Sequence, residues 1–262
     1  MNALYNQSEM EAEPFNPDFT NVDRVLDEVE RPDPLTGDYQ TFFLVKWCAL
    51  PYEESTWEIE SDVDIIKIGV FRKIRDTPPK TKYVARRHPD TWRPLKEPQT
   101  FLNGCSLRSY QVEGVSWLLF NFLQDRNCIL ADEMGLGKTV QSVTYLQHLR
   151  NQGIDGPFLV IAPLSTLGNW QREFELWTDM NVVMYHGGAA SRDIIHTYDM
   201  YARDSKGRPI KNGYRGVLQK CHVKRRARAS SWAFCDIFGQ KSKFLKFVFR
   251  RAARTRRAVG KF

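Results

Sequence analysis

Five consecutive residues, Gly135-Leu136-Gly137-Lys138-Thr139, have the types and spacing of a loop that binds the phosphates of a nucleotide. Such a loop leads into a helix, so that backbone N–H groups and the helix dipole point at one anion. The two glycines let the backbone approach the phosphates closely. Lys138 would then reach the β- and γ-phosphates, and the hydroxyl of Thr139 would bind Mg²⁺.

The strict form of this motif, G-x-x-x-x-G-K-[ST], has glycine where this chain has Asp132. A glycine-rich turn that only caps a helix therefore stays open as the alternative. The flanking sequence favours the nucleotide loop, because a buried strand is predicted before it at 127–131 and a helix after it to about Arg150. Hydrolysis would also need an acidic partner that holds Mg²⁺ and positions a water.

Helices and strands alternate around this loop, which predicts an α/β domain with a parallel sheet and helices on both faces. The expected elements are a helix at 107–124, the strand at 127–131, the helix after the loop, a strand at 158–162, a helix at 165–177, a strand at 182–185 and a helix at 189–201.

The preceding residues predict a small β module that ends in a helix. We expect strands at 21–30, 39–50 and 55–58 and a helix from about residue 62, with Ile65, Ile66 and Val70 lining one face. The predicted divisions are an acidic flexible lead-in (1–18), the β module (19–77), a basic Pro-rich linker (78–104), the α/β domain (105–214) and a basic tail expected to be disordered (215–262).

Charge is distributed unevenly along the 262 residues, whose formal net charge is +7. Residues 215–262 hold 15 of the 38 Lys and Arg residues and one acid, Asp236, so this segment carries +14 and residues 1–214 carry −7. The five cysteines show no metal-binding spacing, and we expect Cys48 and Cys128 to be buried, reduced thiols. The polar N-terminus and the lack of a long apolar stretch predict a soluble intracellular protein.

The stretch SLRSYQVEGVSWLLFNFLQDRNCILADEMGLGKTVQSVTYL, at 106–146, closely resembles the first ATPase lobe of the helicase-like chromatin-remodelling ATPases. That family has Asp at the position of Asp132, so the departure from the generic motif favours the resemblance. The resemblance implies a RecA-like (P-loop) lobe, ATP and Mg²⁺ as ligands, and adenine recognition by Gln111, which would otherwise be interpreted as a surface helix residue. The implied nucleotide-binding residues are Gln111, Asp132, Glu133, Met134, Gly135, Leu136, Gly137, Lys138 and Thr139.

A second motif, LVIAPLSTLGNWQREFELW at 159–177, resembles the next motif of that family. The resemblance places Pro163, Ser165 and Thr166 near the DNA backbone.

VDRVLDEVE at 22–30 and FFLVKWCALPYEESTWE at 42–58 resemble a chromodomain. A chromodomain, a basic linker and this ATPase lobe, in that order, resemble the chromodomain-helicase-DNA-binding family, and YHGGAASRDIIHTYDMYARDSKGRPIKNGY at 185–214 resembles its Kismet-like branch. The resemblance covers about residues 15–214 and implies that this chromodomain is the second of the family's pair. It also implies a nuclear chromatin remodeller that regulates transcription, with DNA, nucleosomes and histone tails as partners and no membrane.

The family's methyl-lysine cage positions correspond to Thr20, Trp47 and Leu50. A cage binds the ammonium through cation–π attraction to several aromatic rings. Only one of these three residues is aromatic, so we expect no methyl-lysine reading. A regulatory or DNA-facing module is the expected role instead.

In this family a strand ending in Asp-Glu-Ala-His holds Mg²⁺ and positions the water. No Asp-Glu pair follows Thr139, and Asp236, the remaining candidate, precedes Ile237 rather than a second acid. A second lobe would supply an arginine whose loss typically costs about 10³–10⁵ in turnover, and this lobe is missing too. We therefore expect a fragment or truncated isoform of a remodelling ATPase that binds ATP but does not hydrolyse it alone.

The composition and the resemblance both change at Arg215, which indicates an alternative exon, a retained intron or a frameshift. KRRAR (224–228) and RRAARTRR (250–257) match nuclear-import signals or phosphate contacts, and FLKFVFRRAARTRR (244–257) suits a basic amphipathic helix. Arg-rich sequence without a selected function stays equally open. The alternative function is a non-catalytic chromatin- or DNA-binding protein acting through the chromodomain and the basic tail.

Overall fold

The computed structural model describes residues 16–32, 37–78, 90, 92–96, 100–154, 156, 158–204, 207–214, 217–221 and 246–248. The chain forms two compact units, which divide after Lys73. The lead-in up to residue 15, most of the linker, the two basic clusters of the tail and Asp236 lie outside the described residues. No helix in the described part is both long enough and apolar enough to cross a membrane.

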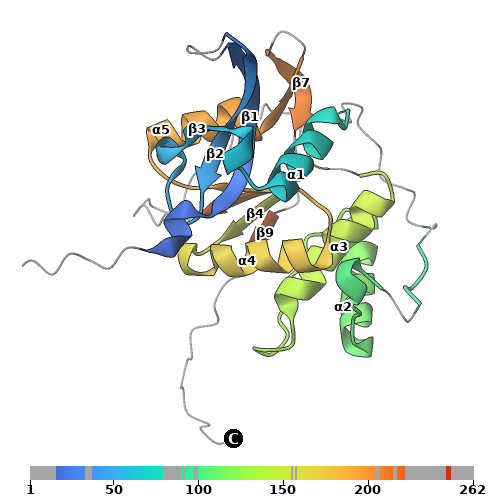
Figure 1. Ribbon diagram of the computed structural model, residues 1–262. Helices are drawn as coiled ribbons and strands as arrows, with labels where there is room; N and C mark the ends of the chain where they lie inside the picture. The colour runs from blue at the N-terminus through green and yellow to red at the C-terminus, as the bar shows by residue number, and fades with distance from the viewer. Residues whose placement is uncertain are drawn as a thin grey trace, which may run out of the picture. The chain divides into compact units, whose positions relative to one another are not determined.

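The N-terminal unit contains a three-stranded antiparallel sheet in the order β1-β2-β3, drawn in blue in Figure 1. Its strands are β1 (Val22–Pro32), β2 (Tyr39–Trp47) and β3 (Thr56–Ile59). The three strands predicted for the β module are thereby confirmed. Two register shifts near the start of β1 bulge this strand against β2.

Helix α1 (Ile65–Asp76) packs against this sheet. Its first turn is capped by Asp64, whose Oδ1 accepts a hydrogen bond from the backbone N of Ile66 over 2.8 Å. Ile68 and Phe71 of α1 belong to the same core as Phe43 of β2. The helix thus covers one face of the three-stranded sheet and closes the core of this unit.

The predicted apolar face of α1 is wrong. Ile65, Ile66 and Val70 are 80%, 70% and 50% exposed. Because a helix turns by about 100° per residue, burying Ile68 and Phe71 directs those three residues away from the core. The sequence of α1 offers two possible apolar faces, the predicted one and the one that contains Ile68 and Phe71. The packing of the helix on the sheet determines which face is buried.

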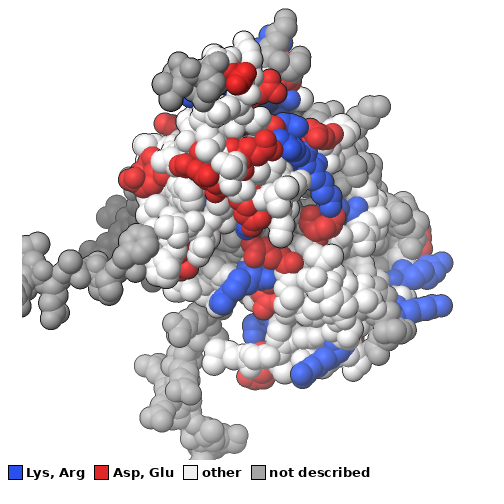
Figure 2. All heavy atoms as spheres, viewed as in Figure 1, with Lys and Arg blue, Asp and Glu red and all other residues white. Residues whose placement is uncertain are grey.

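Acidic side chains gather over the N-terminal unit, as Figure 2 shows. Residues 16–73 contain thirteen Asp and Glu residues against six Lys and Arg residues. One of these bases, Lys46, is buried, and its Nζ donates to Asp23 Oδ2 over 3.1 Å. An acidic unit with few exposed cations repels phosphates, which argues against a DNA-facing chromodomain.

The C-terminal unit contains a four-stranded parallel sheet in the order β5-β8-β4-β9. Its strands are β4 (Phe158–Ala162), β5 (Val182–Tyr185), β8 (Val217–Cys221) and β9 (Lys246–Val248). Its helices are α2 (Ser109–Leu123), α3 (Lys138–Asn151), α4 (Leu164–Trp177) and α5 (Ala189–Ile194), which continues into a π-helical turn (Ile195–Asp199). β6 (Tyr201–Arg203) and β7 (Pro209–Tyr214) form a separate antiparallel hairpin.

The strand predicted at 127–131 is not formed, and Ile129 is 83% exposed. A parallel strand needs ladder hydrogen bonds to a neighbour, and both edges of β4 are occupied by β8 and β9. Cys128 in this segment is exposed and Cys48 is only half-buried, so the expectation of two buried thiols is also wrong.

β8 and β9 come from the segment expected to be disordered, so that expectation fails at residues 217–221 and 246–248. β8 lies between β5 and β4 and is therefore an inner strand of the sheet. The sequence just after Arg215 consequently belongs to the folded α/β unit.

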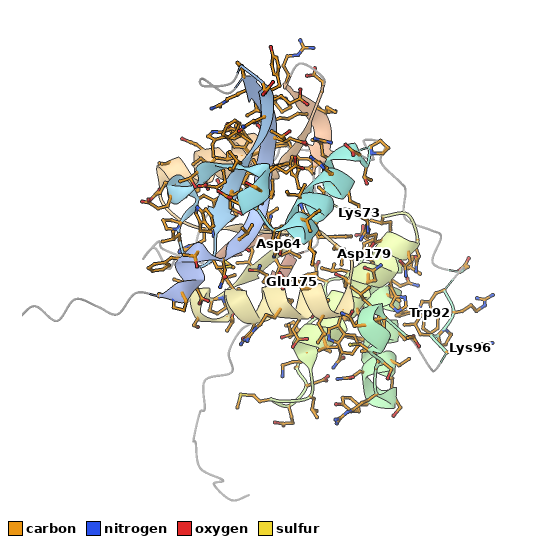
Figure 3. All side chains as sticks on the ribbon, viewed as in Figure 1. Asp64, Lys73, Trp92, Lys96, Glu175 and Asp179 are labelled. Carbon is orange, nitrogen blue, oxygen red and sulfur yellow. The ribbon has the colours of Figure 1, made fainter. Side chains whose placement is uncertain are left out.

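Side chains tie the helices of the C-terminal unit to neighbouring loops (Figure 3). Nη1 of Arg150, near the end of α3, donates to Oδ1 of Asp179, just beyond α4, over 2.7 Å. The ring of Trp92, from the linker, packs edge-on against Phe120 of α2 with 5.2 Å between centroids. The last turn of each helix that flanks the predicted nucleotide loop thus has a contact outside the helix.

Candidate nucleotide-binding site

The predicted phosphate loop joins α2 to α3 and contains two glycines in the left-handed region. Gly135 has a φ of 91° and Gly137 a φ of 77°, values that residues with a Cβ rarely adopt. Gly137 is the N-cap of α3, and Lys138 and Thr139 form its first turn. The positive end of the α3 dipole therefore lies at the end of the loop, as phosphate binding requires.

Lys138 folds back over the loop that precedes it. Its Nζ donates to the backbone oxygens of Asp132 over 2.7 Å and Glu133 over 2.8 Å. Both acceptors are carbonyls, so phosphate oxygens could replace them without breaking an ion pair. The ammonium is thus already placed on the loop residues that would surround a phosphate.

Two buried glutamines hold the loop from the adjacent helices. Oε1 of Gln111, on α2, accepts from the backbone N of Arg108 over 3.0 Å, and its Nε2 donates to the carbonyl of Leu136 over 3.2 Å. Gln141, on α3 and fully buried, donates from Nε2 to Oδ2 of Asp132 over 2.9 Å. Asp132 therefore supplies an acceptor that glycine lacks, which explains the departure from the generic motif.

Gln111 is only 8% exposed, so the alternative of a surface helix residue is wrong. The site residues predicted around the loop, from Gln111 to Thr139, lie together. Met134 and Leu136 of the same loop are 88% and 38% exposed.

Gln141 and Gly114 are residues that the sequence did not single out. A Cβ added at Gly114 would lie 2.1 Å from Oε1 of Gln141, so α2 and α3 approach here because residue 114 has no side chain. The available signal was spacing, since Gln141 follows Lys138 by three residues and shares its helix face.

No acid directly follows any strand of the parallel sheet among the residues that the structure describes. The residues after β4, β5, β8 and β9 are Pro163, His186, His222 and Phe249. In open α/β sheets the functional side chains gather beyond these carboxyl ends. The described residues also contain no group of three or more His, Cys, Asp or Glu residues that could hold a metal ion.

Pro163, Ser165 and Thr166 stand at the start of α4, after the carboxyl end of β4. Pro163 is the N-cap of this helix, and its carbonyl accepts from Oγ1 of Thr166 over 2.9 Å. Pro163 and Ser165 are exposed. An exposed helix N-terminus suits a backbone phosphate, and DNA contact at these residues stays a prediction.

Two domain families and several known proteins match this chain. Residues 20–72 match the chromo (chromatin organisation modifier) domain, and residues 110–227 match the SNF2-related domain. Over 208 residues, 79% of this chain, it is 52% identical to chromodomain-helicase-DNA-binding protein 9 of Mus musculus. Over 203 residues, 78% of this chain, it is 54% identical to chromodomain-helicase-DNA-binding protein 8 of Homo sapiens. The chain belongs to the chromodomain-helicase-DNA-binding family.

The chain covers only 7% and 8% of the lengths of these two relatives. The SNF2-related match continues to residue 227, past Tyr214, where the resemblance was expected to stop, and it includes β8. A solved structure titled "Sulfolobus solfataricus SWI2/SNF2 ATPase core in complex with dsDNA" aligns with a TM-score of 0.37 at 27% identity, over 49% of this chain and 23% of that one.

Two residues at the cage positions of the chromodomain form hydrogen bonds within the domain. Nε1 of Trp47 donates to Oγ1 of Thr56 over 2.9 Å, and Oγ1 of Thr20 donates to the carbonyl of Pro17 over 2.9 Å. A nearby aromatic ring, Trp57, is covered by the guanidinium of Arg31 of the same chain, 4.9 Å from its centroid. That the domain does not read methyl-lysine stays a prediction.

Proposed function

We propose that the loop from Asp132 to Thr139 binds the phosphates of ATP, and that the 262-residue polypeptide does not hydrolyse ATP by itself. The observation that carries the binding proposal is the placement of Lys138 Nζ on two backbone carbonyls at the N-terminus of α3. Gln111 would recognise adenine while it holds Leu136, which would couple the base to the loop.

Mg²⁺ would be held by phosphate oxygens and by the hydroxyl of Thr139, in the first turn of α3. The cation supplies charge neutralisation between the β- and γ-phosphates. Hydrolysis also requires a group that positions the attacking water, and the four described strands of the sheet end without an acid directly after them. This difference supports binding without turnover.

We further propose that the chain derives from an ATP-driven translocase that remodels nucleosomes in the nucleus and contacts DNA and histones. Its chromo and SNF2-related domains and its identity to two chromodomain-helicase-DNA-binding proteins support this parent activity. DNA contact would involve the start of α4 and the basic tail, because the N-terminal unit is acidic.

A direct test titrates the 262-residue chain with a fluorescent ATP analogue and measures DNA-stimulated ATP turnover. Lys138→Ala should abolish saturable binding, and Lys96→Ala, at an exposed lysine of the linker labelled in Figure 3, should leave it unchanged. Turnover above background that disappears in Lys138→Ala would contradict the second half of the proposal and would point to Asp236.

The second candidate is a chromatin-binding protein without a nucleotide site, supported by the +14 charge of residues 215–262. ATP binding that is absent, or that does not respond to Lys138→Ala, would favour this candidate. DNA binding through the tail should ignore base sequence and weaken by orders of magnitude between about 50 and about 200 mM salt.

A further inference from the structure

A single Thr-Pro dipeptide, Thr77-Pro78, lies directly after helix α1. Among the 13 prolines of the chain, Pro78 alone follows a serine or a threonine. Helix α1 ends at Asp76, and Thr77 and Pro78 are both exposed. An exposed threonine just outside a helix is accessible to an enzyme that modifies hydroxyl groups.

A proline directly after the threonine can be recognised for a physical reason. Proline has no backbone N–H, so an apolar pocket without a hydrogen-bond acceptor binds it at no penalty. Any other residue would bury an unpaired N–H in that pocket, and this cost excludes it. Proline also favours extended backbone in the residue before it, which is the form in which a kinase cleft binds an acceptor. Thr77 therefore has the local sequence of a kinase acceptor.

The sequence also places a base at a fixed distance from this hydroxyl. Residues 77–80 are Thr-Pro-Pro-Lys, so Lys80 follows Thr77 by three positions. Three extended residues span about 10 Å. An ammonium at that distance can pair with an acidic group beside a kinase cleft. The segment thus combines two independent recognition features, a proline and a base.

The last turn of α1 can open without uncovering the core. This turn begins at Lys73, labelled in Figure 3, and its four residues are exposed or half-buried. The buried residues of α1, Ile68 and Phe71, precede it. Within the turn, Nε of Arg75 donates to Oδ1 of Asp76 over 2.8 Å, and an exposed pair of this kind contributes little stability. The residues before Thr77 can therefore extend into a kinase cleft at low cost.

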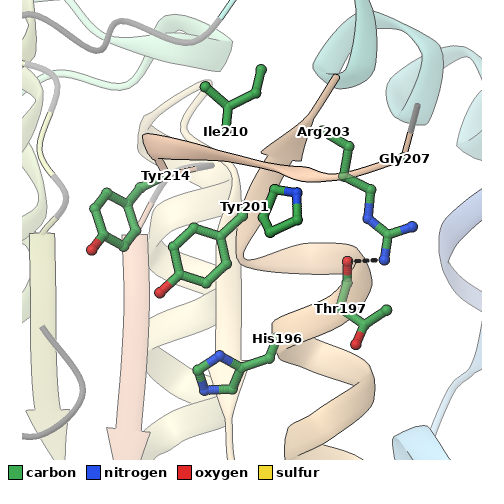
Figure 4. Close-up of a pocket in the computed structure, with 8 residues that line it drawn as sticks. His196, Thr197, Tyr201, Arg203, Gly207, Ile210 and Tyr214 are labelled. Atoms are coloured by element: carbon green, nitrogen blue, oxygen red, sulfur yellow. Dashed lines mark hydrogen bonds between the residues drawn. The ribbon is translucent and has the colours of Figure 1, made fainter. Parts of the chain in front are cut away.

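Hydroxyl groups of the C-terminal unit offer a contrast. Thr197, Tyr201 and Tyr214 line a cavity of about 610 Å³ (Figure 4). Thr197 lies within the π-helical turn, and Tyr201 pairs with Tyr214 across the β6–β7 hairpin. Backbone that is already bonded in a helix or a strand pair has to unfold before it can extend into another protein's cleft. Thr77 belongs to neither kind of element.

We propose that Thr77 is phosphorylated by a proline-directed serine/threonine kinase whose cleft also pairs with Lys80. Oγ1 of Thr77 bonds to the γ-phosphorus of ATP, and the bond from that phosphorus to the bridging oxygen of ADP breaks. ADP leaves with the electron pair, and the hydroxyl proton passes to the catalytic aspartate of the kinase. The product carries about −1.5 to −2 of added charge between the acidic N-terminal unit and the basic linker. This ATP belongs to the kinase, so the step is independent of the phosphate loop.

The test incubates the folded 262-residue chain with ATP and a purified proline-directed kinase, cyclin-dependent kinase 2 bound to cyclin A. Trypsin cleaves after Arg75 and Lys80, and the product, residues 76–80, contains no hydroxyl other than that of Thr77. Mass spectrometry of this product therefore locates the phosphate. We expect phosphate on this peptide, its loss in Thr77→Ala and its retention in Thr77→Ser.

Two pairs of variants test how the segment is recognised. Pro78→Ala restores a backbone N–H beside the acceptor and should lower kcat/KM for phosphorylation about tenfold or more, whereas Pro79→Ala should leave it unchanged. Lys80→Ala removes the base and should lower kcat/KM about tenfold, whereas Lys82→Ala should have no effect. All four positions follow the end of α1, so these changes leave its buried face intact.

Four results would overturn the proposal. Phosphate found only on other hydroxyls would exclude Thr77 as the acceptor. An unchanged kcat/KM in Pro78→Ala would remove the recognition of proline, and an unchanged kcat/KM in Lys80→Ala would remove the role of the base. A folded chain that stays unmodified, while the same kinase phosphorylates a synthetic peptide of residues 70–84, would show that α1 prevents access to Thr77.

Discussion

Nε2 of Gln141 lies 2.9 Å from Oδ2 of Asp132, and this bond joins the interior of α3 to the start of the phosphate loop. The same Nε2 lies 3.5 Å from the carbonyl of Leu136, which also accepts from Gln111. Side chains from both α2 and α3 therefore bind the same loop. In the proposed site Gln141 would act as a positioning residue, since its contacts are with the loop itself.

Replacing this amide should weaken ATP binding. Gln141→Leu leaves the Asp132 carboxylate without the buried donor, and the loss of one charge-assisted hydrogen bond, about 1.5–3 kcal/mol, corresponds to roughly a tenfold or greater rise in the Kd for ATP. Gln147→Leu is the matched control on the same helix, because Gln147 bonds to Asn151. Equal Kd changes in both variants would show that helix stability, not loop shape, sets the affinity.

Two glycine-to-alanine changes should act in opposite directions. Gly114→Ala places a Cβ 2.1 Å from Oε1 of the buried Gln141, so we expect it to lower the free energy of unfolding by about 1–3 kcal/mol. Gly168→Ala, on the exposed side of α4 with no atom within 4 Å of its Cβ, should raise it by about 0.5–1 kcal/mol. Urea denaturation of the two variants measures both effects, and stabilisation by Gly114→Ala would refute the close approach of α2 and α3.

The stability of the C-terminal unit should depend on pH through His148. Burial lowers the pKa of this imidazole from 6.5, and its ring lies 5.6 Å from that of Phe101. The unfolded chain therefore binds this proton more readily, and the free energy of unfolding falls as pH drops through 6.5 towards the lower pKa of the folded state. His148→Leu should flatten this dependence, whereas His186→Gln, at an exposed position, should retain it. Thermal unfolding across this pH range measures the slope.

The chromodomain should not bind a trimethyl-lysine peptide. Of the three cage positions only Trp47 is aromatic, and its indole N–H is bonded to Thr56. Titration with a trimethylated histone-tail peptide should show no saturation in the low micromolar range. The double variant Thr20→Tyr with Leu50→Tyr should gain affinity by supplying two further rings. Low-micromolar binding by the unaltered chain that Trp47→Ala abolishes would contradict this expectation.

Local sequence patterns determined most elements of this protein. Apolar runs bounded by turn residues predicted β1, β2 and β4, and Gly135, Gly137 and Lys138 predicted the loop at the start of α3. These features depend on residues a few positions apart, so their signal is contained in a short stretch. The order of the two domains likewise follows from sequence.

Partners distant in sequence decided the rest. The run at 127–131 has the composition of a strand. However, the two edges of β4 pair with residues 217–221 (β8) and 246–248 (β9) instead. The buried face of α1 depended on the sheet that it covers, and the bond between Gln141 and Asp132 depended on how closely α2 approaches α3 at Gly114. Strand pairing and side-chain packing form between segments that are distant in sequence. The residues of one segment therefore do not determine which other segment it contacts.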